Sequence, residues 1–231
     1  MTTLLAELPS RASFHSRPSS SVRPPIVFVV ADDEHARLLL TQLITTTGFD
    51  VEGCGSAEAF LSLPRPAVPC CLLLDVPVPV VKGLELQRQV GARMDMPIVF
   101  ITGCPDVRVT VQAMKAGAVD VLAKPVNLEQ LSTAVEAAME VSRAALRHDA
   151  AMGQLRASYA SLTPREREVM AQVVSGLLNK QVAFELHISE ITVKAHRGQV
   201  MRKMKADSLP HLVRMAARLG VVLAPSTTDF M

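Results

Sequence analysis

The sequence has no tryptophan and a single tyrosine, Tyr159, among its 231 residues. Proteins that hold single-stranded nucleic acid stack its bases on aromatic side chains, so this composition argues against that class. The four cysteines show no CxxC or Cys/His spacing that is typical of a metal site. Two of them, Cys70 and Cys71, are adjacent in an apolar run, which favours reduced thiols in a cytoplasm.

Long apolar stretches are also missing. No run approaches the ~18–20 residues that a membrane helix needs, and residues 1–25 lack the basic start and apolar core of a secretory signal. These 25 residues are rich in Ser, Pro and Arg without periodicity, which predicts a disordered tail. The sequence therefore predicts a cytoplasmic protein with no membrane partner.

Charge is present, but unevenly. Residues 1–150 hold 13 Lys and Arg against 16 Asp and Glu, whereas residues 151–231 hold 11 against 6. An acidic part followed by a basic part suggests a nucleic-acid-binding module behind another domain.

Strand and helix signals alternate from Ile26 to about residue 145. Five apolar runs are each followed by helical spacing, which predicts an α/β fold with a doubly wound, five-stranded parallel sheet. The expected strands are 26–30, 51–54, 70–75, 97–102 and 119–123, and the expected helices include 83–90 and 106–117.

Polar residues stand at the carboxyl ends of four of these strands: Asp32, Asp75, Thr102 and Lys124. Taken alone, Asp75 is readily explained as a strand-terminating residue that caps a turn. In an open parallel sheet, however, strand ends converge on one crevice. Two carboxylates there favour Mg²⁺ between them, and lysine and hydroxyl groups favour a transferred phosphoryl group. The pattern predicts an aspartyl-phosphate site with Asp75 as nucleophile.

Four motifs resemble the receiver domain (CheY/flavodoxin-like) of two-component response regulators. They are the acidic run after the first strand, LLLDV-x-x-P-x-x-x-G, FITG and AKP. The resemblance covers residues 26–145. It implies that a sensor histidine kinase phosphorylates Asp75. It also implies that Mg²⁺ is bound by Asp32, Asp75 and the carbonyl of Pro77. The residues that it places around the phosphoryl group are Asp33, Thr102, Lys124 and Pro125.

Three positions depart from that family. Ala31 replaces the outer of two consecutive acids, which should weaken Mg²⁺ binding. Val121 replaces the switch aromatic, and Cys104 begins an altered loop after FITG. These departures motivate an alternative, in which a degenerate receiver acts as a constitutive dimerisation module. A redox role for Cys104 is a weaker hypothesis.

The segment from Leu128 to about Ser158 is rich in alanine and predicts a long helix. This helix is interpreted both as the last helix of the receiver and as a helical linker between the two domains. We expect the linker at residues 146–160.

Residues 161–231 predict an all-α, four-helix domain. Thr163, Pro164 and Glu166 form a capping box for a helix that runs to about 178. A short helix, 179–186, is joined by His187-Ile188-Ser189 to a basic helix, 190–205, and a fourth helix spans 208–219. Two helices joined by a three-residue turn form a helix-turn-helix. We expect Ile191, Val193, Val200 and Met204 to face inward.

LTPREREV, NKQVAFEL, ISEITVKAHR and VMRKM resemble the LuxR/FixJ-type DNA-binding domain. The resemblance implies a DNA face and a dimer contact on the last helix. The DNA-binding candidates are Lys180, Ser189, Glu190, Thr192, Val193, Lys194, His196, Arg197 and Lys203. The dimerisation candidates are Val121, Lys124, Leu209, Leu212 and Val213.

The leading hypothesis is therefore a bacterial response regulator whose phosphorylation at Asp75 controls dimerisation and binding of promoter DNA, with RNA polymerase as a further partner to consider. An enzyme of the haloacid-dehalogenase type is rejected, because such sites need an acid two residues after the nucleophile, where Pro77 stands.

Overall fold

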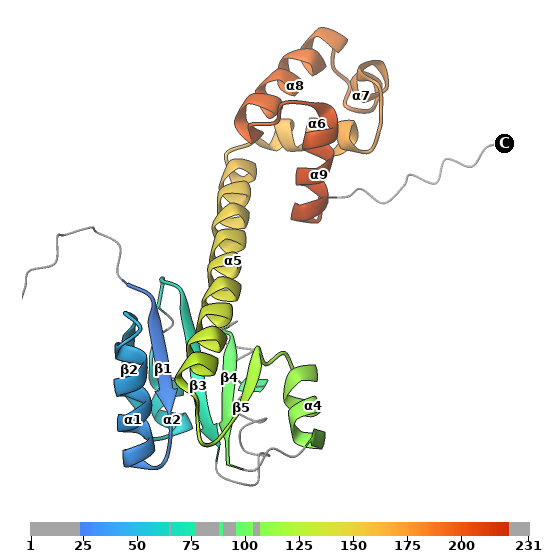
Figure 1. Cartoon of the computed structure of the whole chain (residues 1–231). Helices are drawn as coiled ribbons and strands as arrows, with labels where there is room; N and C mark the ends of the chain where they lie inside the picture. The colour runs from blue at the N-terminus through green and yellow to red at the C-terminus, as the bar shows by residue number, and fades with distance from the viewer. Residues whose placement is uncertain (1–23, 65, 77–87, 90–95, 104–106, 222–231) are drawn as a thin grey trace, which may run out of the picture. The chain divides into compact units, whose positions relative to one another are not determined.

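The computed structural model describes residues 24–64, 66–76, 88–89, 96–103 and 107–221. The chain forms two compact units that divide within one long helix, between Met139 and Glu140 (Figure 1). Each unit has hydrophobic clusters of its own. No helix in the described part of the chain is long and apolar enough to cross a membrane.

The N-terminal unit is built on a five-stranded sheet in which every neighbouring pair is parallel, in the order β2-β1-β3-β4-β5. This confirms the doubly wound sheet. The strands are β1 (Ile26–Val30), β2 (Asp50–Cys54), β3 (Cys70–Val76), β4 (Ile98–Thr102) and β5 (Asp120–Ala123). The helices are α1 (Glu34–Thr45), α2 (Ala57–Ser62), α4 (Val107–Lys115) and the first part of α5 (Leu128–Ala160).

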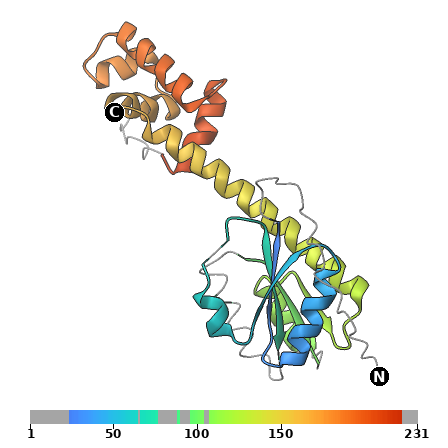
Figure 2. The ribbon, with the colours of Figure 1, turned by 90° about the vertical axis from the view of Figure 1, so that its left-hand side faces the viewer.

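Side chains of each strand alternate between two buried layers, as the period of two requires. Leu72 and Leu74 of β3 join a cluster with Phe60 of α2, while Cys71 and Leu73 join one with Leu40 of α1 and several residues of α5. The sheet thus lies between α2 on one side and α1 and α5 on the other (Figure 2). Burial on both faces explains why the strands are continuous apolar runs.

Some predictions for this unit fall outside the described residues. They are the tail up to residue 23, most of the helix expected at 83–90, and Pro77 and Cys104.

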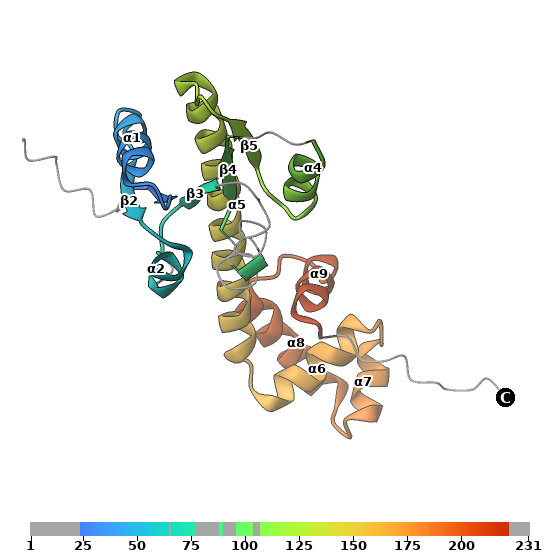
Figure 3. The same ribbon diagram turned by 90° about the horizontal axis from the view of Figure 1, so that it is seen from below.

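The C-terminal unit contains four short helices: α6 (Pro164–Val174), α7 (Asn179–Glu185), α8 (Glu190–Met204) and α9 (Leu209–Leu219) (Figure 3). The capping box of Thr163 and Glu166 is present. The predicted end of α6 near 178 was wrong, because Gly176 takes a φ of 94° and turns the chain after Val174. His187 has a φ of 53°, so the turn between α7 and α8 contains a residue in the left-handed conformation.

The segment predicted as a linker, 146–160, is the last part of the continuous helix α5. Met152, Leu155 and Tyr159 pack against the cluster that contains Met204 of α8 and Leu212 of α9. This part of α5 therefore belongs to the core of the C-terminal unit. The proposed limits at residues 145 and 161 stay a prediction.

Candidate functional sites

Asp75 lies at the carboxyl end of the central strand β3, between β1 and β4. The chain leaves β1 toward β2 on one side and returns to β3 on the other, so strand order reverses next to Asp75. This is where open α/β sheets bind ligands. The side chain is nevertheless buried, with 7% of the residue exposed.

Lys124 and Thr102 converge on Asp75, as the sequence predicts. Lys124 follows β5, and its Nζ lies 2.7 Å from Oδ2 of Asp75. Its backbone N–H donates to the carbonyl of Thr102 at 2.8 Å, which ties the end of β5 to the end of β4. Thr102 is 3% exposed and is paired in register with Val76, next to Asp75. A cation and a hydroxyl-bearing residue thus flank the carboxylate.

The second oxygen of this carboxylate is incomplete. Asp75 Oδ1 is buried and has no hydrogen-bond partner among the described residues. A buried anionic oxygen that lacks a donor is costly, and native proteins normally supply one or bind an ion there. The arrangement therefore has the chemistry of a site that a cation or a reacting group completes.

Asp32 and Asp33, the acidic residues after β1, differ in their surroundings. Asp33 accepts a hydrogen bond from the backbone N–H of Ala36 at 2.9 Å and is the N-cap of α1. That hydrogen bond lowers the pKa of Asp33, and Lys124 adds a smaller lowering. Asp33 is thus a helix cap close to the site, whereas Asp32 is exposed in the turn. Ala31 is buried, and its carbonyl accepts from Nη1 of Arg37 at 2.9 Å.

The carboxylate oxygens of Asp75 and Asp32 are of the kind that Mg²⁺ prefers. Magnesium is usually held in proteins by one or two carboxylates with water completing its shell. Asp75 and Asp32 are such carboxylates at the ends of the neighbouring strands β3 and β1. Protein ligands would be few, because the described residues contain no cluster of three or more His, Cys, Asp or Glu suited to a metal. Of the other candidates, Pro125 follows Lys124 after a cis peptide bond and is exposed, and Pro77 lies outside the described residues.

In the C-terminal unit, α8 presents one exposed face. Ser189 caps the helix by accepting from the N–H of Thr192 at 3.1 Å. Lys194 is 62% exposed and lies 3.1 Å from Glu190. Arg197 donates to Asn179 at the start of α7. An exposed, capped basic helix packed on a preceding helix is the geometry of a major-groove reader.

The comparisons assign a family to each of the two units. The sequence pattern of the response regulator receiver domain matches residues 27–136, and that of bacterial regulatory proteins of the luxR family matches 160–216. Nodulation protein W of Bradyrhizobium diazoefficiens is 46% identical over 85% of this chain and 87% of that protein. The chain belongs to the response regulators with a LuxR-type DNA-binding domain.

Two further likenesses are informative. Transcriptional regulatory protein FixJ of Rhizobium meliloti is 44% identical over 84% of this chain and 96% of its own length. A solved structure of the response regulator StyR, 41% identical, covers 85% of this chain and is itself covered completely, with a TM-score of 0.72. The family regulates transcription and is not a class of metabolic enzymes. Its receiver domain implies a histidine-kinase partner, and its LuxR-type domain implies binding to DNA.

Within this response regulator, burial corrects part of the predicted DNA face. Val193 is fully buried against α6 and α7, so its side chain is not available to DNA. Lys203 reaches back to Glu166 and to the carbonyl of Ser161. Ile191, which we expected inside, is 80% exposed. The remaining candidates are exposed or half-buried: Lys180, Ser189, Glu190, Thr192, Lys194, His196 and Arg197.

Two residues of this face were missed by the sequence reasoning. Ala195 and Gly198 are exposed on α8, one and four residues after Lys194. A helical period counted from Lys194 would have found Gly198. Ala195 lies about 100° further round the helix and would not have been found in this way. Their small side chains leave room for close approach of another molecule.

The predicted dimer contacts need a similar correction. Leu212 is fully buried and Leu209 is partly buried in the core beneath α8, so Leu212 cannot meet a second copy in this conformation. Val121 is half-buried and packs on the sheet, and Lys124 is paired with Asp75. Of the predicted set, Val213 on α9 is an exposed apolar side chain, at 39%.

Proposed function

We propose that a sensor histidine kinase phosphorylates Asp75 and that the phosphoryl group controls dimerisation and sequence-specific binding to promoter DNA. The observation that carries this is the carboxylate of Asp75, whose Oδ2 lies 2.7 Å from Lys124 while Oδ1 is buried without a described partner. Buried polar atoms in native proteins normally have a hydrogen-bond partner, so a buried carboxylate oxygen without one supports a role in binding or chemistry.

The chemistry assigned to these residues is a phosphoryl transfer. An oxygen of Asp75 attacks phosphorus as the bond to the nitrogen of the kinase histidine breaks, and an acyl phosphate forms. Lys124 then pairs with a phosphoryl oxygen instead of the carboxylate, and the hydroxyl of Thr102 donates to another. Asp32 and Asp75 would hold Mg²⁺, which offsets the negative charge of the transferred group.

Phosphorylation would act as a switch by biasing two states of the receiver. Moving Lys124 from the carboxylate to the phosphoryl group changes the ends of β4 and β5, because the backbone of Lys124 is tied to Thr102. In the proposed active state two copies associate, and two α8 helices enter major grooves about one DNA turn apart. Such a regulator would act in the bacterial cytoplasm.

A second candidate keeps the DNA binding and drops the chemistry. Ala31 stands where an outer acid is usual and Val121 where a switch aromatic is usual, and Val121 is half-buried on the sheet. In this reading the receiver dimerises without phosphate.

Incubation of the full chain with acetyl phosphate and Mg²⁺, followed by intact-protein mass spectrometry, tests the first candidate. We expect a phosphoryl adduct in the native chain and in the matched variant Asp50→Asn, which changes an exposed carboxylate at the start of β2, and no adduct in Asp75→Asn. Sedimentation of the same samples should show dimers only where the adduct is present. Dimers of equal abundance in Asp75→Asn and in untreated protein would select the second candidate.

A further inference from the structure

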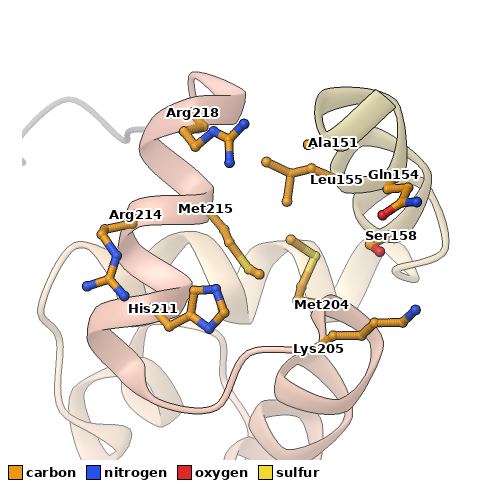
Figure 4. Close-up of a pocket in the computed structure, with 10 residues that line it drawn as sticks. All are labelled: Ala151, Gln154, Leu155, Ser158, Met204, Lys205, His211, Arg214, Met215 and Arg218. Carbon is orange, nitrogen blue, oxygen red and sulfur yellow. The ribbon is translucent and has the colours of Figure 1, made fainter. Parts of the chain in front are cut away.

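The C-terminal unit contains a pocket that neither the receiver chemistry nor the DNA face uses. It lies between the end of α5 and helix α9, beside the end of α8, and its volume is about 370 Å³ (Figure 4). This volume is within the ~300–1,000 Å³ range of small-molecule sites.

The inner surface of the pocket is apolar and adaptable. Leu155 of α5 and Met204 at the end of α8 are buried, with 7% and 1% exposed, and Met215 of α9 is partly buried in the same cluster. Figure 4 shows Met204 and Met215 reaching toward each other between the helices. Thioether side chains are flexible and polarisable, so they adjust to ligands of different shape.

The rim of the pocket is cationic. Arg218 extends over one end toward Leu155, and Lys205 lies at the other end on the side of Ser158 (Figure 4). The residues that line the pocket include three Lys and Arg and no acid. The acid Asp207 is 93% exposed and lies 3.5 Å from His211. An anion is therefore favoured, and a guanidinium such as Arg218 binds a carboxylate with two parallel hydrogen bonds.

Charge and polarity together favour one class of ligand. A cationic rim above an apolar inner surface suits a small amphiphilic anion. We propose that the pocket binds a small organic carboxylate with an apolar body, whose carboxylate meets Arg218 or Lys205 and whose body lies on Leu155, Met204 and Met215.

Such a ligand would directly contact α8, the second helix of the helix-turn-helix. Met204 is the last residue of α8, and Leu155 connects the same cluster to α5. Occupancy would fix the packing of α8 against α5 and α9 independently of Asp75. The site is a second input to the regulator and does not depend on whether Asp75 is phosphorylated.

The test uses the full chain labelled with ¹³C at its methionine methyl groups, of which there are 11. Octanoate is titrated, with octanamide as the same body without charge and acetate as the charge without a body. We expect octanoate to shift the methyl signals of Met204 and Met215. It should bind at least about tenfold more tightly than either control compound, because only octanoate has both a carboxylate for the cationic rim and an apolar body for the inner surface of the pocket.

The variant Lys205→Gln/Arg218→Gln should weaken octanoate binding about tenfold or more. Both side chains are exposed, so the fold should persist, as an unchanged unfolding temperature would show. Arg156→Gln removes one exposed cation from α5 outside the pocket and should leave binding unchanged. Three outcomes would each overturn the proposal. Octanamide could bind as tightly as octanoate, or the double variant could bind octanoate as tightly as the native chain. The third is that the signals of Met204 and Met215 do not shift up to about 10 mM octanoate.

Discussion

Each unit of the protein contains a buried carboxylate paired with a lysine, and the two pairs have the same length. Asp75 and Lys124 are 2.7 Å apart, as are Glu166 and Lys203. Asp75 is 7% exposed and Glu166 is 5% exposed. The pairs differ in what else the carboxylate meets: Glu166 also accepts the backbone N–H of Thr163 at 2.8 Å, whereas Oδ1 of Asp75 has no described partner.

This difference distinguishes the structural pair of Glu166 from the pair of Asp75, for which we propose a reactive role. Glu166 closes a capping box and anchors α8 to the start of α6 through Lys203, so its interactions stabilise the fold. Both described bonds of Glu166 end on Oε2, whereas Asp75 lies at a strand end where open α/β sheets bind ligands, and its Oδ1 is buried without a described partner. Burial and an ion pair therefore do not identify a site by themselves. A buried atom without a partner does not suffice either, because Nε of Arg167 and Oε1 of Gln172 are also such atoms; the position of Asp75 at the switch point of the sheet is the further observation.

Removing the reactive carboxylate should have the largest effect. We expect Asp75→Asn to lose the phosphoryl adduct completely in mass spectrometry with acetyl phosphate and Mg²⁺. Its free energy of unfolding should change by less than about 1 kcal/mol, because the partner Lys124 has a 40% exposed side chain that water can solvate. An adduct that survives in this variant would place the acceptor elsewhere.

Removing the structural carboxylate should act on stability instead. Glu166→Ala leaves Lys203 and the N–H of Thr163 without their partner, so we expect a loss of about 2 kcal/mol. For a unit of this size the unfolding temperature should fall by roughly 8–16 °C in calorimetry. Glu168→Ala is the matched control, because its exposed pair with Arg165 is worth less than about 1 kcal/mol. Equal losses in both variants would refute the structural role of Glu166.

Two lysines of α8 extend the comparison to DNA. Lys194 is exposed and Lys203 is bound to Glu166. We expect Lys194→Ala to weaken promoter binding about fivefold and to reduce the slope of log K against log salt by about 1. Lys203→Ala should change that slope little, since the ammonium of Lys203 is held at 2.7 Å by a buried carboxylate, whereas both partners of the Lys194–Glu190 pair are exposed. Salt titrations of both variants by fluorescence anisotropy test this, and equal changes in slope would contradict it.

The smallest expected effect is a pH dependence. The hydrogen bond from Lys203 is the main cause that lowers the pKa of Glu166 from its ordinary 4.5. A carboxyl group whose pKa is lower when folded stabilises the protein above the unfolded pKa, and this contribution is lost as pH falls through the folded value. The native chain should therefore be more stable than Glu166→Gln in urea at pH 7, and the gap should narrow below about pH 4.5. A constant gap would show that ionisation of Glu166 is not involved.

Much of this architecture was readable from local patterns. Apolar runs flanked by turn residues predicted each described strand to within one residue, and converging strand ends brought Asp75, Thr102 and Lys124 together. The capping box of Thr163 and Glu166 was also predicted, because a cap depends on neighbours within three positions. The end of α6 was predicted too late, since Gly176 adopts a left-handed conformation that its identity permits but does not require.

The sequence by itself determined the order of elements, the parallel sheet, the helix-turn-helix and the family, because these follow from periodicity, caps and motifs along the chain. Only the tertiary structure decided that Val193 and Leu212 are buried and Ile191 is exposed. It also decided that Lys203 pairs with Glu166. These outcomes depend on which elements pack together, and contacts between residues distant in sequence leave no periodic signal in either segment.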